Sequence, residues 1–131
     1  MYIASVKVAN SNIEGRGVFA LEDIAAGMIV WKFKDGYDKR ITKQQYDKLD
    51  DKTKSTGYLS PSTNLYVFPP TGDPACFTNH SKDNNLSTVF DTKVSDEPYF
   101  VANRDIKSGE ELTNNYLEFD KVTQNLKPDW A

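Results

Sequence analysis

The sequence predicts a mostly β fold with short helices, built by a single domain that spans residues 1–131. Short segments rich in β-branched and aromatic residues recur along the chain, and glycine, proline or asparagine separates them. One clear helix start is present, at Thr42. Hydrophobic residues make up 38% of the chain, which at this length is enough for a buried core. Many short strands around one brief helix are typical of mostly β domains.

The first third of the chain predicts three strands. Residues 2–8 alternate and are rich in β-forming side chains, as a half-buried strand is. Residues 18–20 and the apolar run 28–33 predict the second and third strands. Asp35-Gly36 is a turn signal that follows the third strand.

The middle of the chain predicts a short helix, a loop and a strand. The helix is expected to begin after Thr42, because Thr42 and Gln45 have the spacing of a capping box. It is expected to end before Asp51, and residues 52–63 have the composition of a loop. A strand over residues 64–68 follows, and two prolines end it.

The last third predicts a strand pair, a final strand and a tail. Residues 86–91 and 99–102 look like a pair of strands around a loop. Residues 112–116 predict the final short strand. Residues 117–131 are partly apolar, and we expect them to hold a short helix that docks on the body of the domain.

Composition excludes several classes of function. The net charge of −3 argues against a nucleic acid as the main partner, and no apolar run is long enough to predict a membrane span. The single cysteine rules out an internal disulfide and a multi-cysteine zinc cluster, so no metal is expected. The start of the chain has no signal pattern. We therefore expect an intracellular protein, cytoplasmic or nuclear, or one that acts in a host cell if it is viral or secreted by a bacterium.

The densest group of candidate functional residues is the polar loop 76–86, Cys-Phe-Thr-Asn-His-Ser-Lys-Asp-Asn-Asn-Leu. It holds the only histidine, His80, and the only cysteine, Cys76. Its hydroxyl and carboxamide side chains can hydrogen-bond to nearby backbone, which holds tight, irregular loops. Such a loop suits a site that grips a polar ligand through main-chain and amide groups. A thiol nucleophile paired with His80 is an alternative, but closeness in sequence is no evidence of a dyad.

A second alternative concerns the glycines near the start of the chain. Gly15-x-Gly17-x-x-Ala20 fits a dinucleotide-binding fingerprint, with Asp35 near the place of a ribose-binding acid. That fold needs a helix directly after the glycines, within a βαβ unit. Residues 18–19 are Val-Phe and favour a strand, so we reject this alternative.

Two stretches flank the polar loop. Upstream, residues 13–20 are Ile-Glu-Gly-Arg-Gly-Val-Phe-Ala, and downstream, residues 104–116 are Arg-Asp-Ile-Lys-Ser-Gly-Glu-Glu-Leu-Thr-Asn-Asn-Tyr. In order and spacing, the three stretches resemble the SET-domain protein-lysine methyltransferases. The family pattern is Gly-x-Gly, then Asn-His-Ser-Cys-x-Pro-Asn, then Arg-Asp-Ile-x-x-Gly-Glu-Glu-Leu-Thr-x-x-Tyr. The resemblance implies a SET-type fold of small curved sheets with a threaded C-terminal segment.

The resemblance also implies S-adenosylmethionine as the cofactor. Gly15, Arg16 and Gly17 would contact its methionine part through main-chain groups. Asn79 would hydrogen-bond the cofactor ammonium, and the main chain of His80 would contact adenine. The implied site contains no metal.

The implied reaction is attack by a neutral lysine amine on the sulfonium methyl group, with Tyr116 as the catalytic residue that positions the amine. The substrate channel needs aromatic walls, and Tyr58, Tyr66 and Phe119 are the candidates. Asn114 stands two residues before Tyr116, where the family often has Phe or Tyr. The bulk of those side chains helps to limit how many methyl groups are added, so the degree of methylation stays open here.

The tail and the departures from the family pattern leave two hypotheses. As an enzyme, the protein would methylate a lysine-containing protein, such as a histone or another basic protein. Residues 117–131 would close the cofactor site, with Trp130 as the candidate that covers adenine, and a homodimer in which a twin subunit completes the site stays open. As the alternative, Lys82, Asn84 and Asn114 support a catalytically inactive SET-fold module that binds a protein or peptide.

Overall fold

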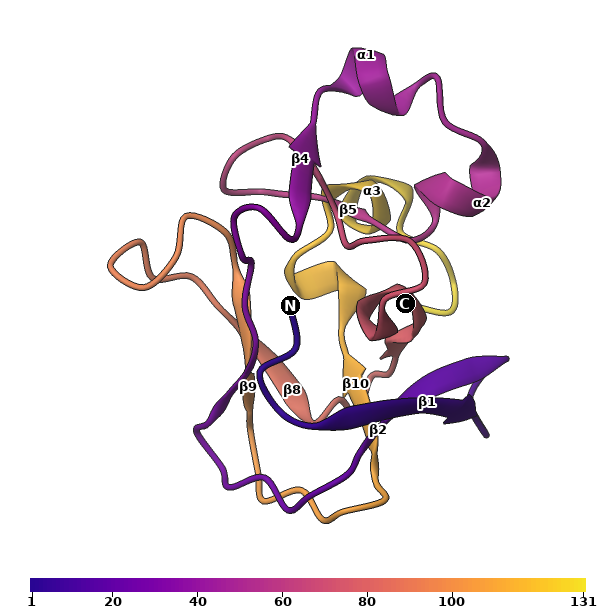
Figure 1. Ribbon diagram of the computed structural model, residues 1–131. Coiled ribbons are helices and arrows are strands. Elements are labelled where there is room, and N and C mark those ends of the chain that lie inside the picture. The colour runs from indigo at the N-terminus through magenta and orange to yellow at the C-terminus, as the bar shows by residue number, and fades with distance from the viewer.

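The structure is a computed structural model that describes residues 1–131. It contains three small sheets and a few short helices, which confirms the predicted mostly β fold (Figure 1). Side chains from all three sheets meet in one apolar core. Its buried members are Val18, Ala20, Ile24, Val30, Trp31, Phe33, Val67, Leu86, Phe100, Ala102, Ile106, Leu112 and Phe119.

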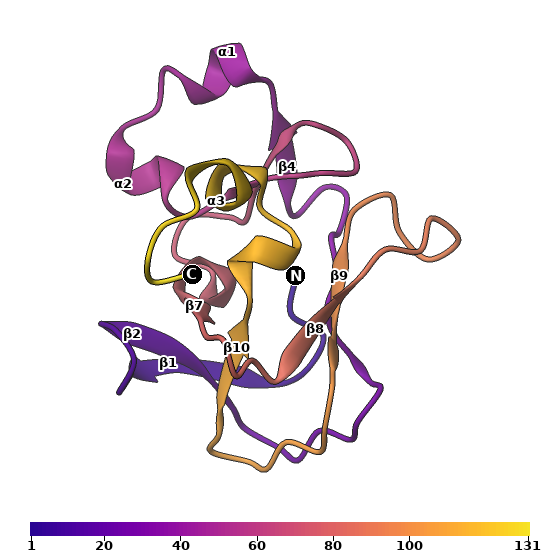
Figure 2. The same cartoon turned by 180° about the vertical axis from the view of Figure 1, so that it is seen from behind.

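The first sheet contains the last strand of the chain between two earlier strands. Its order is β1 (Val6–Asn10), β2 (Arg16–Ala20), β10 (Glu111–Asn114) and β7 (Asn79–His80). β1 and β2 form an antiparallel hairpin. β10 pairs antiparallel with β2 and parallel with β7, so the predicted threading of the C-terminal segment is visible where β10 runs beside β7 (Figure 2).

The other two sheets have three antiparallel strands each. The second is ordered β3 (Ile29–Trp31), β9 (Tyr99–Ala102) and β8 (Leu86–Val89), and the third is ordered β4 (Lys39–Ile41), β6 (Tyr66–Phe68) and β5 (Tyr58–Leu59). The predicted pair of strands is confirmed, because Leu86 lies opposite Ala102 and Val89 opposite Tyr99.

The helices are short and capped by side chains. They are α1 (Lys43–Tyr46), α2 (Asp51–Lys54) and α3 (Lys121–Leu126), with single 3-10 turns η1 (Pro74–Phe77) and η2 (Tyr116–Glu118). The predicted capping box of Thr42 and Gln45 is present at α1. α1 and α2 bury no residue and form the arm at the top of Figure 1. No helix has the length and apolar character needed to cross a lipid bilayer.

Two predictions in the first half of the chain were partly wrong. The first strand begins at Val6, and Tyr2 makes only an isolated bridge to Trp31. Residues 52–63 are not all loop, because the Asp50 side chain caps α2 by accepting a hydrogen bond from the backbone of Thr53. The same stretch also supplies β5, which pairs with β6.

The end of the predicted final strand was also wrong. β10 stops at Asn114, and Tyr116 begins the 3-10 turn η2. The reason is local: the side-chain oxygen of Asn115 accepts a hydrogen bond from the backbone N–H of Leu117, which turns the chain out of the sheet. Tyr116 therefore lies at a bend.

Candidate active site

The start of β2 is held by the side-chain amide of Asn79. The Nδ2 atom of Asn79 lies 3.1 Å from the backbone carbonyl oxygens of Glu14 and Arg16, and the same distance from Oγ of Ser11. An amide nitrogen donates and does not accept, so the Nδ2 end of the Asn79 amide faces the Gly15–Gly17 loop. The Oδ1 atom of Asn79 makes no hydrogen bond within the chain.

Glu111 lies directly beneath this loop. Its carboxylate accepts hydrogen bonds from Nδ2 of Asn79, at 2.9 Å, and from Oγ of Ser11, at 2.7 Å. A Cβ atom on Gly17 would lie 2.8 Å from Cδ of Glu111 and 3.2 Å from Nδ2 of Asn79. A side chain at position 17 would therefore require the carboxylate of Glu111 to move.

The parallel pairing of β7 and β10 brings His80 next to Tyr116. Asn114 lies opposite His80 in the register, and Tyr116 follows two residues later. The Nδ1 atom of His80 accepts a hydrogen bond from the backbone N–H of Tyr116, at 3.1 Å. Burial, with the charge of Lys82 as a second cause, lowers the pKa of His80 below its usual value, which fits an imidazole that accepts a hydrogen bond.

The hydroxyl of Tyr116 is held by the backbone of Thr78, the residue before Asn79. It donates a hydrogen bond of 2.6 Å to the backbone carbonyl of Thr78. Oγ1 of Thr78 lies 2.6 Å from the hydroxyl of Tyr2. Burial, followed by the charge of Asp120, raises the pKa of Tyr116 to about 12. Tyr116 is therefore a neutral phenol at physiological pH.

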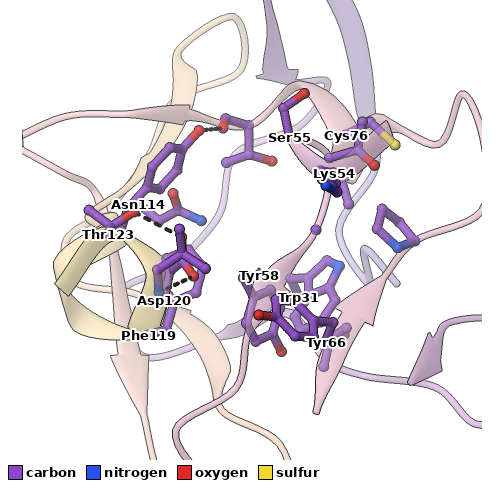
Figure 3. Close-up of a pocket in the computed structure, with 18 of the residues that line it drawn as sticks. Trp31, Lys54, Ser55, Tyr58, Tyr66, Cys76, Asn114, Phe119, Asp120 and Thr123 are labelled. Atoms are coloured by element: carbon purple, nitrogen blue, oxygen red, sulfur yellow. Dashed lines mark hydrogen bonds between the residues drawn. The ribbon is translucent and has the colours of Figure 1, made fainter. Parts of the chain in front are cut away.

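Tyr116 lies in the wall of a cavity of about 450 Å³, which Figure 3 shows in close-up. Most of the side chains in this wall are aromatic or apolar. The five other residues predicted for the substrate channel and the tail line the same cavity: Tyr58, Tyr66, Asn114, Phe119 and Trp130. The structure thus brings together the residues predicted for the substrate channel and the one predicted for the tail.

The residues predicted to bind the cofactor adjoin this cavity but do not line it. The ring of His80 packs edge-on against the rings of Tyr116 and Trp130, with centroids 5.2 Å apart in both pairs. Thr78, which precedes Asn79, does line the cavity. The predicted cofactor residues and the predicted channel therefore meet at Tyr116 and Thr78.

Three residues of the cavity wall carry a buried polar atom that has no hydrogen-bond partner in the chain. The atoms are Oδ1 of Asn114, the hydroxyl of Tyr58 and Nε1 of Trp31. Asn114 is only 4% exposed. Because buried polar groups are nearly always paired, these atoms indicate that the cavity receives a polar group or water.

The structure adds wall residues that the sequence analysis missed. Tyr46 of α1 stacks on Tyr66 with ring centroids 3.8 Å apart, and the ammonium of Lys54 lies 5.2 Å from the Tyr46 centroid. The only signal for Tyr46 was an aromatic side chain on a short polar helix. Trp31 also lines the cavity, as does the half-buried Cys76 of the polar loop. Trp31 lies in an apolar run, which gave no sign of a cavity.

Comparison with known proteins settles the family. A model of the SET domain family matches residues 15–117. The chain belongs to the SET domain family. This SET domain is 28% identical over 119 residues to histone-lysine N-methyltransferase 2D of Homo sapiens. The aligned stretch covers 88% of this chain and 2% of the relative. It is also 28% identical over 124 residues to N-lysine methyltransferase KMT5A-A of Danio rerio, in an alignment that covers 88% of this chain and 36% of that relative.

A solved structure confirms the predicted SET-type fold. The crystal structure of a candidate histone methyltransferase from Plasmodium falciparum superposes with a TM-score of 0.58 and 21% identity, over 86% of this chain and 93% of that one. The SET domain described here spans well under half the length of the curated relatives it matches. No three His, Cys, Asp or Glu side chains lie close enough together to hold a metal ion.

Proposed function

We propose that this SET domain transfers a methyl group from S-adenosylmethionine to the side-chain amine of lysine in a protein substrate. The observation that carries the proposal is the hydrogen bond from the Tyr116 hydroxyl to the Thr78 carbonyl, in the wall of an aromatic cavity. The names of the curated relatives describe lysine methyltransferases, and one of them names histone. A histone or another basic protein, inside a cell, is the substrate class we propose.

The residues of the chain fit the proposed cofactor. Oδ1 of Asn79 is free to accept a hydrogen bond from an ammonium group, while Nδ2 is already used. Gly17 keeps the loop backbone against Asn79. When bound, S-adenosylmethionine supplies a methyl group activated by the sulfonium charge.

The cavity suits the neutral form of a lysine amine. The reference pKa of lysine is about 10.4, so exposing the free amine at neutral pH costs about 4–5 kcal/mol. An apolar environment disfavours the charged form and therefore reduces this cost. The rings of Tyr58, Phe119 and Tyr66 supply such an environment in the cavity wall.

Tyr116 would orient the amine. Its phenol is neutral and its proton is directed at Thr78, so an oxygen lone pair remains to accept an N–H of the incoming amine. The Thr78 carbonyl lies next to the Tyr116 hydroxyl and can accept weak C–H contacts from a methyl group. Alignment of this kind supplies much of the rate in a reaction with little covalent work for the protein.

The two departures in the polar loop do not enter the cavity. Lys82 is exposed, and Nδ2 of Asn84 donates to the backbone carbonyl of Leu86, at 2.8 Å. Neither side chain lines the cavity. The inactive-module alternative therefore keeps only Asn114 as a departure within the site.

The test combines binding and turnover. Calorimetric titration with S-adenosylmethionine should show saturable binding that Asn79→Ala weakens. Transfer of radiolabelled methyl to lysine-rich proteins should fall by orders of magnitude in Tyr116→Phe, with cofactor binding retained. Absence of binding both alone and with a lysine-rich peptide would reject the proposal, and unchanged turnover in Tyr116→Phe would remove its assigned role.

A further inference from the structure

One carboxylate in the site has no assigned role and no cationic partner. Glu111 is half-buried, and no lysine or arginine forms an ion pair with it. Its two oxygens are used on polar side chains, Oε1 on Ser11 and Oε2 on Asn79. Removing a carboxylate from water is costly, so a half-buried one that only receives neutral hydrogen bonds suggests a role beyond packing.

We propose that Glu111 is a positioning residue for cofactor binding, because it holds the amide of Asn79 in one orientation. The proposal rests on the proposed function and concerns the amino-acid end of the cofactor. Of the four contacts that Nδ2 of Asn79 makes, the one to Oε2 of Glu111 is the shortest, at 2.9 Å. An ionised carboxylate can accept hydrogen bonds but cannot donate them. A flipped amide would put Oδ1 against that charge, so Oδ1 stays free for a cationic amino group.

Ser11 extends this arrangement into the loop. Its hydroxyl donates to Oε1 of Glu111 at 2.7 Å and accepts from the backbone N–H of Ile13 at 2.9 Å. The backbone N–H of Ser11 donates to the carbonyl of Gly15, at 2.9 Å. Glu111 thus controls both the amide and the turn that precedes Gly17. The Ser11–Glu111 contact joins β10 to the turn between β1 and β2, and the other two contacts lie within that turn.

Two substitutions separate orientation from charge. Glu111→Gln keeps an oxygen that can accept a hydrogen bond from Asn79, while its amide nitrogen can donate one to Oγ of Ser11. Glu111→Met has a similar size and removes both acceptors. The matched control is Glu110→Met, because the exposed carboxylate of Glu110 accepts only from the backbone of Lys107 in its own turn.

The experiment measures calorimetric affinities for two ligands. S-adenosylmethionine carries the amino-acid end, and 5′-methylthioadenosine lacks it. We expect Glu111→Met to weaken S-adenosylmethionine binding by about tenfold or more while methylthioadenosine binding stays unchanged. Glu111→Gln should restore most of the lost affinity, and Glu110→Met should change neither ligand.

Three outcomes would overturn the proposal. Equal loss for both ligands in Glu111→Met would mean that Glu111 only supports the fold. No loss for either ligand would mean that the amide is fixed without Glu111. A Glu111→Gln variant as weak as Glu111→Met would assign the effect to charge rather than orientation. Failure of the unaltered protein to bind either ligand would instead contradict the proposed function.

Discussion

The ring of His80 accepts a hydrogen bond from the backbone N–H of Tyr116, with 3.1 Å between Nδ1 and N. The contact joins β7 to the bend that carries the proposed catalytic hydroxyl. It requires an unprotonated Nδ1 atom, since a protonated one cannot accept. The placement of Tyr116 is therefore coupled to the charge of the single histidine in the chain.

Acid should weaken the folded state through His80. Burial lowers its pKa, so the folded protein binds this proton less readily than the unfolded chain, whose histidine titrates near about 6.5. The stabilising contribution is then complete above about pH 6.5 and is lost as the pH falls through the lowered folded value. Denaturant unfolding at pH 7 and pH 5 should show a larger loss in the unaltered protein than in His80→Gln, and carboxylate effects cancel in this comparison.

The same prediction has a direct spectroscopic check. His80 is the only imidazole, so one NMR signal reports its titration without assignment of others. We expect its midpoint below the usual histidine value. A midpoint at or above that value would show that His80 does not act as a buried acceptor.

Gly17→Ala should destabilise the domain and weaken cofactor binding. The added Cβ would press on Glu111 and lie 3.2 Å from Nδ2 of Asn79, and such overpacking costs about 1–3 kcal/mol. Gly15→Ala is the stability control, because Gly15 has a φ of +49° and open space around its Cα. In Gly15→Ala the free energy of unfolding should fall only by the strain of a left-handed backbone, about 1 kcal/mol. Denaturant unfolding measures both, and equal losses would contradict the packing argument.

Asn114→Phe should lower the number of methyl groups added to each lysine. A phenyl ring would occupy part of the cavity, and pockets of this kind discriminate one added methyl by about tenfold or more. Loss of a buried, unpartnered Oδ1 should keep the folding cost small. Mass spectrometry of the methylated substrate gives the ratio of states. Asn114→Ala, which enlarges the cavity, should not restrict the product, and an unchanged ratio in Asn114→Phe would remove Asn114 from the channel.

Trp130→Ala should reduce cofactor affinity with little effect on folding. Trp130 is 56% exposed, so its removal should cost about 1 kcal/mol or less of stability. Its ring nevertheless packs against His80 and Tyr116, where the tail approaches the site. Leu126→Ala is the control in the same tail, because Leu126 is 73% exposed and does not line the cavity. Equal cofactor affinity in the two variants would contradict a closing role for the tail.

The sequence predicted those elements whose signals are local. The strand pair β8 and β9 follows from apolar residues bounded by turns, and the capping box at Thr42 follows from the spacing of two side chains. β4 and β5 were missed because Lys39–Ile41 is polar and Tyr58–Leu59 has only two residues. Both become strands by pairing with β6, which no local pattern shows.

Prediction of the site was limited in the same way, because the sequence shows local motifs but not which distant side chains meet. The motifs predicted Asn79, His80 and Tyr116, and the register of β7 against β10 brings their segments together. The sequence did not reveal Tyr46 in the cavity wall, because its place depends on stacking against Tyr66. Nor did it show that Glu111 bonds to Asn79, since no spacing rule relates the two side chains.

The insertion of β10 between β2 and β7 bears on how the protein is made. During synthesis β2 leaves the ribosome long before its partner, so one of its edges stays unpaired and open to wrong association. Ser11 and Glu111, which meet at the loop, are 100 positions apart in the chain. Contacts of such long range form slowly, and here they complete both the sheet and the proposed cofactor site. A nascent chain would thus have no binding capacity until its last strand has joined, and ligand binding would mark the finished molecule.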